Sequence, residues 1–194
     1  GVDLDYRASR PLFGEEIRLL EGEHGPLDVE LELGEGDWGA YARLEIRFPV
    51  SLAQDVQIFS HDRSSPLDQI RKVQEIELGD EDFDREFLLF ARDRQRLETY
   101  VAPRIRRRLL RLNDYTDEIR LTDRSLFAFV GDGCDRREVA ALLKQGIGLA
   151  RQCVRSARLI GPSSARKRVE DYEAAAFEQG LVGGSVRRVE SDGA

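Results

Sequence analysis

Residues 29–48 read VELELGEGDWGAYARLEIRF, and this stretch decides the fold class. Apolar residues alternate with charged ones from Val29 to Leu33 and again from Ala42 to Phe48, on either side of a glycine-rich segment. Alternation with a period of two residues is typical of a β-strand that has one buried face and one solvated face. Two such strands joined by a turn predict an antiparallel β-hairpin.

The polar face of this hairpin carries opposite charges on its two strands. Glu30 and Glu32 belong to the first strand, and Arg43 and Arg47 belong to the second. Cross-strand pairs of opposite charge stabilise a hairpin modestly. We therefore interpret this face as solvated and structural.

The spacing of apolar residues and turn signals predicts further strands along the chain. They are expected at residues 55–60, 85–91, 118–121 and 126–130, and one more ends at Gly79. Residues 15–20 form either one helical turn or a strand. The second hairpin, over 118–130, repeats the antiparallel arrangement of the first.

Helices are predicted at residues 94–101, 103–112, 135–160 and 163–179, with Asp93 and Asp135 as N-caps. Gly146 and Gly148 lie inside the longest one and either permit close packing on the sheet or mark a weak point. The sequence therefore predicts an α+β fold, in which an antiparallel sheet built from hairpins has helices packed on one face. We expect a single domain over residues 1–160, followed by a C-terminal helix and a flexible tail in 161–194.

The composition limits the classes of function that the chain can have. It has 194 residues and a net charge of -7, which argues against general nucleic-acid affinity because that requires an excess of basic side chains. Two cysteines are too few for a disulfide framework. The sequence contains no run of about eighteen apolar residues, so it predicts no membrane-spanning helix. We expect a cytoplasmic domain. The chain contains no methionine, so we expect that sequence preceding Gly1 has been removed, and any association with a membrane would come through that sequence.

No catalytic, cofactor-binding or metal-binding residue is predicted. His24 and His61 fall in separate polar loops without the spacing of a metal-binding pair. Cys134 lies near a helix start, where the pKa of a thiol can fall; the alternative is a plain strand-to-helix turn. The acidic run at residues 75–86 lacks the oxygen spacing of a calcium loop and indicates a solvated segment.

Four arginines are the predicted partner-binding residues, because the helix expected at 103–112 places them on one stripe beside its buried residues. They are Arg104, Arg107, Arg108 and Arg111. Four neighbouring guanidinium groups repel one another unless anions lie close to them. Those anions are either internal, within residues 75–86, or belong to an external partner. We expect that partner to be a protein, with an anionic lipid surface as the alternative and nucleic acid disfavoured.

The middle of the chain resembles a group of bacterial α+β domains of unknown function. The matching positions run in order through about 80 residues: Asp82-Phe83-Asp84-x-x-Phe87, Asp93, Pro103, Leu109-Leu110-x-Leu112, Leu126, Gly133 and Leu149-Ala150. Some domains of this type follow membrane-spanning segments. The resemblance implies an α+β domain and membrane attachment upstream of Gly1, and it carries over no catalytic residue.

Three hypotheses of function follow. The first is a non-enzymatic interaction or scaffolding domain in a larger or membrane-associated bacterial assembly. The second is a small-ligand-binding or regulatory domain with a pocket between sheet and helices. The third is an enzyme with an unrecognised site, since active sites assemble from residues that are distant in sequence.

Overall fold

The computed structural model describes residues 5–8, 18–36, 39–49, 51–52, 54–60, 76–131 and 133–161. The strands are β1 (Asp5–Ala8), β2 (Arg18–His24), β3 (Leu27–Gly36), β4 (Gly39–Arg47), β5 (Val56–Ser60), β6 (Phe87–Ala91), β7 (Glu118–Leu121) and β8 (Ser125–Val130). The helices are α1 (Glu81–Glu86), α2 (Arg94–Tyr100), α3 (Pro103–Asn113) and α4 (Arg136–Ile160).

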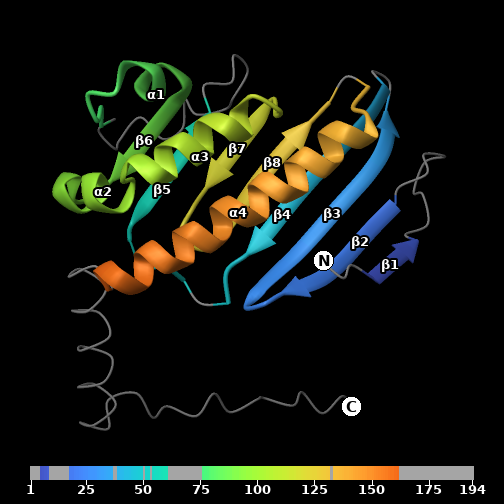
Figure 1. Cartoon of the computed structure of the whole chain (residues 1–194), viewed down its shortest axis with the longest axis horizontal. Helices are drawn as coiled ribbons and strands as arrows, with labels where there is room; N and C mark the ends of the chain where they lie inside the picture. Colours follow the sequence, from blue (N-terminus) through green and yellow to red (C-terminus); the bar gives the residue numbers. More distant parts are fainter. Residues whose placement is uncertain are drawn as a thin grey trace, which may run out of the picture.

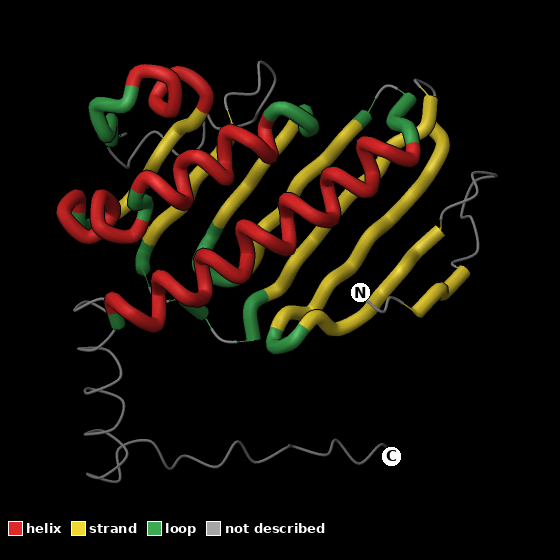
Figure 2. The backbone as a smooth tube through the Cα atoms, in the orientation of Figure 1, coloured by secondary structure: helices red, strands yellow, loops and turns green. Residues whose placement is uncertain are grey.

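All eight strands belong to one sheet, with the order β1-β2-β3-β4-β8-β7-β5-β6. Every neighbouring pair is antiparallel. The helices α3 and α4 lie side by side across the same face of this sheet (Figures 1 and 2). The predicted α+β fold, an antiparallel sheet of hairpins with helices on one face, is confirmed.

The hairpin at residues 29–48 forms with the expected polar face. Its register pairs Glu32 with Arg43, and the side chains of these residues form an ion pair at 3.4 Å. Arg47 pairs with Glu30 at 3.0 Å. This polar face is the face of the sheet that α3 and α4 leave uncovered.

The segment before β6 differs from the prediction of a strand over 85–91, because a short helix, α1, occupies residues 81–86. The Asp84 carboxylate accepts hydrogen bonds from the backbone N–H groups of Leu78, Gly79 and Asp80, at 2.7 to 3.0 Å. These local bonds favour a helical turn over a strand. Residues 76–79, the described part of the expected strand ending at Gly79, lie outside any strand; the N–H of Ile76 bonds to the Leu89 carbonyl of β6.

The other predicted helices begin and end close to the expected residues. Asp93 caps α2 by accepting a hydrogen bond from the N–H of Arg96. Pro103 opens α3, and Asp135 caps α4 in a reciprocal capping box with Glu138. The described part of 15–20 belongs to strand β2, whereas the helix expected at 163–179 and the tail lie outside the described residues.

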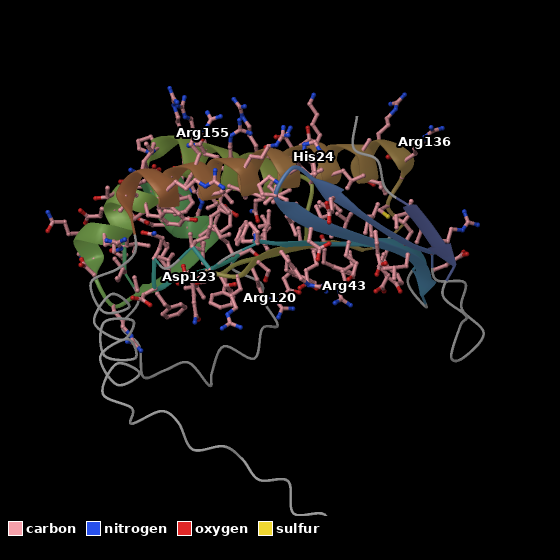
Figure 3. All side chains as sticks on the ribbon, turned by 90° about the horizontal axis from the view of Figure 1, so that it is seen from below. His24, Arg43, Arg120, Asp123, Arg136 and Arg155 are labelled. Atoms are coloured by element: carbon pink, nitrogen blue, oxygen red, sulfur yellow. The ribbon has the colours of Figure 1, made fainter. Side chains whose placement is uncertain are left out.

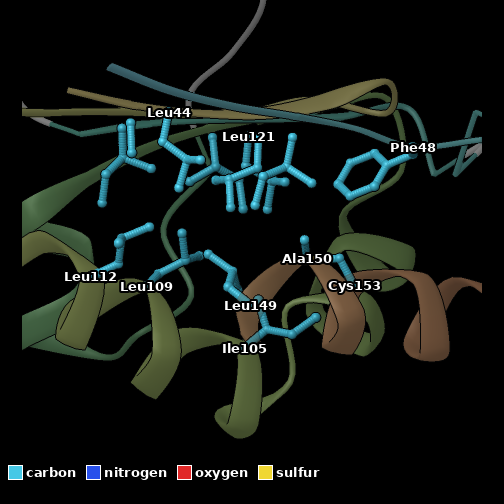
Figure 4. Close-up of a cluster of buried hydrophobic side chains, with 14 of the residues drawn as sticks. Leu44, Phe48, Ile105, Leu109, Leu112, Leu121, Leu149, Ala150 and Cys153 are labelled. Atoms are coloured by element: carbon cyan, nitrogen blue, oxygen red, sulfur yellow. The ribbon is translucent and has the colours of Figure 1, made fainter. Parts of the chain in front are cut away.

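The core lies between the sheet and the helical layer (Figure 4). From α3 it receives Ile105, Leu109 and Leu112, all of which are fully buried. From the sheet, residues such as Leu44 and Leu121 face them. This core fixes which faces of α3 and α4 point outward.

A group of hydrogen bonds holds the C-terminal end of α4 against the rest of the domain. The Gly161 carbonyl, just past the helix, accepts hydrogen bonds from the side chains of Gln54 and Arg96. Gln54 is itself positioned by the Asp123 carboxylate, which accepts from its backbone N–H at 3.0 Å. Because Gly161 is anchored, the last turns of α4 have a defined orientation.

Candidate functional site

The four arginines predicted to bind a partner lie on the outer surface of α3, away from the sheet. Arg104, Arg107 and Arg111 are exposed, and Arg108 is half-buried. One of the two alternatives was that residues 75–86 supply their counter-charges, and within the described part of that segment, residues 76–86, no carboxylate forms an ion pair with these four arginines. Asp80 instead pairs with Arg106 at 2.9 Å, on another side of the helix.

A second basic stripe runs along the whole of α4, and the sequence reasoning missed it. Its members follow one another at steps of three and four residues, which places them on one side of the helix. They are Arg137, Ala140, Lys144, Gly148, Arg151, Arg155 and Arg158. The same spacing was readable in the sequence, but the apolar pattern of this helix masked it. We call this row the α4 stripe.

Arg108 connects the arginines of α3 to the α4 stripe. A β-carbon added at Gly148 would lie 2.7 Å from the Nη1 atom of Arg108. The guanidinium group therefore rests over the glycine, in the gap of the stripe between Lys144 and Arg151. Gly148 thus serves the outer surface, whereas Gly146, two residues earlier, faces the sheet.

The helical layer has a charge opposite to that of the whole chain. Helices α3 and α4 together hold eleven basic residues and one acidic residue, Glu138, in a chain of net charge -7. Figure 3 shows arginine side chains along this layer pointing away from the sheet. Within the described chain no carboxylate forms an ion pair with the four predicted arginines of α3 or with Arg151, Arg155 and Arg158 of α4. We call this outer surface of α3 and α4 the basic surface.

The arginines on the opposite face of the sheet are in a different environment. Arg43 and Arg120 lie over the ring of Phe127, at 5.7 and 4.5 Å from its centre. Arg120 also pairs with Glu118 at 2.7 Å, and Arg43 pairs with Glu32. These guanidinium groups are occupied by local partners, so charge is less available there for an external anion.

Two surface cavities flank α4 on the basic surface. The first, of about 570 Å³, has three arginines, Arg151, Arg155 and Arg158, around an apolar lining that includes Leu27 and Val154. Leu159, which also lines it, is 82% exposed. The second, of about 430 Å³, lies further along α4 beside Lys144 and Ile147. Basic groups thus surround apolar surface at both places.

The pKa of His24 responds to the charge of Arg151, which lines the first cavity. Partial burial lowers the pKa of His24, and the positive charge of Arg151 lowers that pKa further. A cation nearby disfavours the protonated imidazole. His61, the other candidate histidine, lies outside the described residues.

Replacing Arg151 with glutamine is expected to raise the pKa of His24, because the repulsive positive charge is removed. The pKa would be measured by NMR titration of the imidazole C–H resonances, with a His61→Asn background to assign them. Arg43→Gln, on the opposite face, is the control and leaves the pKa of His24 unchanged. An unaltered pKa in Arg151→Gln would show that Arg151 does not act on the imidazole.

The cysteines show no sign of an activated thiol. Burial raises the pKa of Cys134, and the carboxylates of Glu138 and Asp135 raise it further. Cys153, on α4, is fully buried, which raises its pKa to about 12. The N–H groups of Gly133 and Cys134 donate to the Ala40 carbonyl, as expected for the plain strand-to-helix turn.

Two further searches concern metals and membranes. In the part of the chain that the structure describes, no group of three or more His, Cys, Asp or Glu side chains is placed to hold a metal ion. Over the same residues, no helix is both long and apolar enough to cross a membrane. Helix α4 has 25 residues, but charged side chains interrupt it throughout.

Comparison with known proteins gives a likeness of fold. No protein-family model matches the chain, and no curated protein matches it in sequence. A solved structure with a similar fold is that of the mycobacterial trehalose monomycolate transport factor A, TtfA. The match has a TM-score of 0.50 and 10% sequence identity, and it covers 82% of this chain and 90% of the TtfA chain.

Proposed function

We propose that this protein is a non-enzymatic interaction or scaffolding domain, and that it docks on an anionic partner through the basic surface. The observation that carries the proposal is the charge of α3 and α4, with eleven basic residues against one acidic residue in an acidic chain. Clustered positive charges destabilise the protein unless anions lie close enough to neutralise them. An external anionic partner supplies those charges.

The fold supports such a role because it holds the charged side chains in one layer. Ile105, Leu109 and Leu112 fix α3 on the sheet, so its arginines point outward. The anchored carbonyl of Gly161 does the same for the end of α4. Guanidinium groups held in fixed positions lose less entropy when they bind carboxylates or phosphates.

The proposed setting is a membrane-associated bacterial assembly. The resemblance of residues 82–150 to bacterial domains that follow membrane-spanning segments favours this setting. The similar fold belongs to a transport factor, which is compatible with a component of an assembly. The proposal assigns to this chain only the role of a component of an assembly, and it does not assign to it the substrate of TtfA.

A crosslinked pull-down from a lysate of the source cell tests the proposal. The bait is the full chain, and the variant carries Arg104→Glu, Arg107→Glu, Arg108→Glu and Arg111→Glu. Reversing four charges is expected to reduce recovery of the partner at least tenfold, because each attraction becomes a repulsion. Circular dichroism first establishes that the variant is folded.

The control reverses three arginines on the opposite face of the sheet, in the variant Arg43→Glu, Arg47→Glu and Arg120→Glu. This control retains the partner if the basic surface is the docking site. Equal recovery by the parent chain and the α3 variant would contradict the proposal. Equal loss in both variants would show that net charge, and not this surface, governs binding.

A further inference from the structure

The α4 stripe has a chemical character that identifies the anionic partner more narrowly. We propose that α4 docks on an anionic phospholipid surface, with Arg151, Arg155 and Arg158 bound to headgroup phosphates and Leu159 entering the interface. This inference rests on the proposed function and names its partner. Three features of the described residues support it: the length of the stripe, its single sign of charge, and the exposed apolar side chain beside it.

The length of the stripe fits an extended planar partner. Helix α4 has 25 residues, and at 1.5 Å per residue it is about 37 Å long. The stripe extends from Arg137 in the first turn to Arg158 in the last. Figure 3 shows one of its members, Arg155, pointing away from the sheet. A bilayer surface presents phosphates over the whole of that length.

The single sign of charge favours lipid over an acidic protein surface. Protein interfaces are enriched in aromatic residues as well as in arginine, and α4 contains no aromatic residue. In the α4 stripe every charged member is basic, from end to end. Juxtaposed basic residues act additively on an anionic leaflet, whereas a protein interface concentrates its binding energy in a few buried residues.

The apolar part of the surface fits the boundary between headgroups and acyl chains. Leu159 is 82% exposed and lies next to Arg158 at the end of the stripe. The cavity of about 570 Å³ beside it sets three guanidinium groups around the apolar side chains of Leu27 and Val154. A site of this kind accommodates a phosphate together with the glycerol and the first methylenes attached to it, and peripheral helices combine basic and leucine residues in the same way.

The size of the effect follows from the number of basic residues that touch the leaflet. One lysine or arginine near an anionic membrane changes the partition constant about fivefold. Neutralising three is therefore expected to weaken partition about 100-fold. The attraction is screened by salt, so binding also falls as ionic strength rises.

Vesicle flotation with the full chain tests the inference. The vesicles contain phosphatidylcholine alone or phosphatidylcholine mixed with phosphatidylglycerol. The parent chain is expected to float with the mixed vesicles and not with phosphatidylcholine alone. The variant Arg151→Gln, Arg155→Gln and Arg158→Gln loses about 100-fold in partition constant, and Leu159→Ser loses severalfold without any change of charge.

The matched control is Arg43→Gln, Arg47→Gln and Arg120→Gln, which changes the net charge by the same amount on the opposite face. It is expected to bind the mixed vesicles as the parent does. Inorganic phosphate is added in a separate arm, and failure of millimolar phosphate to release the chain shows that a bilayer, not the isolated anion, is the ligand. NMR titration of His24 gives a readout independent of flotation, since the headgroup anions raise its pKa.

The outcomes separate this inference from the proposed function. If the parent chain ignores mixed vesicles while charge reversal still removes its partner in the pull-down, the lipid inference is wrong and the interaction domain stands. If the control triple variant loses vesicle binding as fully as the α4 variant does, the inference is also overturned. If neither vesicles nor lysate shows any dependence on the basic surface, the proposed function fails as well.

Discussion

Leu109→Ala is expected to lower the free energy of unfolding by about 2–5 kcal/mol, as is usual for truncation of a fully buried leucine. Leu109 is the middle of the three fully buried residues that join α3 to the sheet. An isolated helix of this length is unstable in water, so packing must hold it. The four arginines on the outer surface of α3 repel one another and add to that requirement.

Urea unfolding followed by far-UV circular dichroism measures this effect. Leu109→Met is the control, because a swap that preserves volume costs less than about 1.5 kcal/mol. The alanine variant is also expected to recover less partner in the pull-down if it releases α3, since the arginines of α3 then lose their fixed positions. A loss of less than about 0.5 kcal/mol in the alanine variant would mean that α3 is held by something other than this packing.

Gly146→Val is expected to destabilise the domain by about 1–3 kcal/mol, the usual cost of overpacking a core. A β-carbon at Gly146 would lie 2.5 Å from the Cδ2 atom of Leu44, which is fully buried on β4. Valine adds two methyl groups beyond that β-carbon, and the Cδ1 atom of Ile46 already lies 3.6 Å from it. The sheet and α4 would therefore have to separate.

The same substitution at Gly148 is the matched control, and it is expected to change stability by less than about 0.5 kcal/mol. There the β-carbon would meet the end of the Arg108 side chain, which can move into solvent. The favourable helix propensity of valine relative to glycine offsets that movement. Thermal unfolding of both variants makes the comparison, and equal destabilisation at the two positions would contradict the assignment of the two faces.

The two glycines illustrate how far spacing alone can lead. The sequence left open whether they permit close packing or weaken the helix. Gly146 does pack closely on the sheet, and Gly148 instead makes room for an arginine from α3. Two residues apart on a helix they face different neighbours, so the same residue type has two roles.

The sequence by itself determined the two hairpins, strands β5 and β6, and three of the four helices in the described chain, because these elements depend on local signals. It did not predict strand β1, and the strand expected to end at Gly79 does not form. Alternation between Val29 and Leu33 specifies a strand, Asp135 and Pro103 specify helix starts, and the opposite charges of the hairpin specify its polar face. Helix α1 was missed because the bonds that favour it come from the carboxylate of one residue, Asp84. The spacing of apolar residues along the sequence gives no sign of such a hydrogen bond.

Only the tertiary structure decided which charged side chains form ion pairs with neighbouring residues and which do not. Ion pairs form between groups brought together by the fold, so Asp80 reaches Arg106 of α3 across 26 residues. The other four arginines of α3 form no ion pair in the described chain. The same holds for the joining of the α3 arginines to the α4 stripe through Arg108 and Gly148. Periodicity places a side chain on one side of its own helix, but the neighbour that it meets depends on how two helices pack on one sheet.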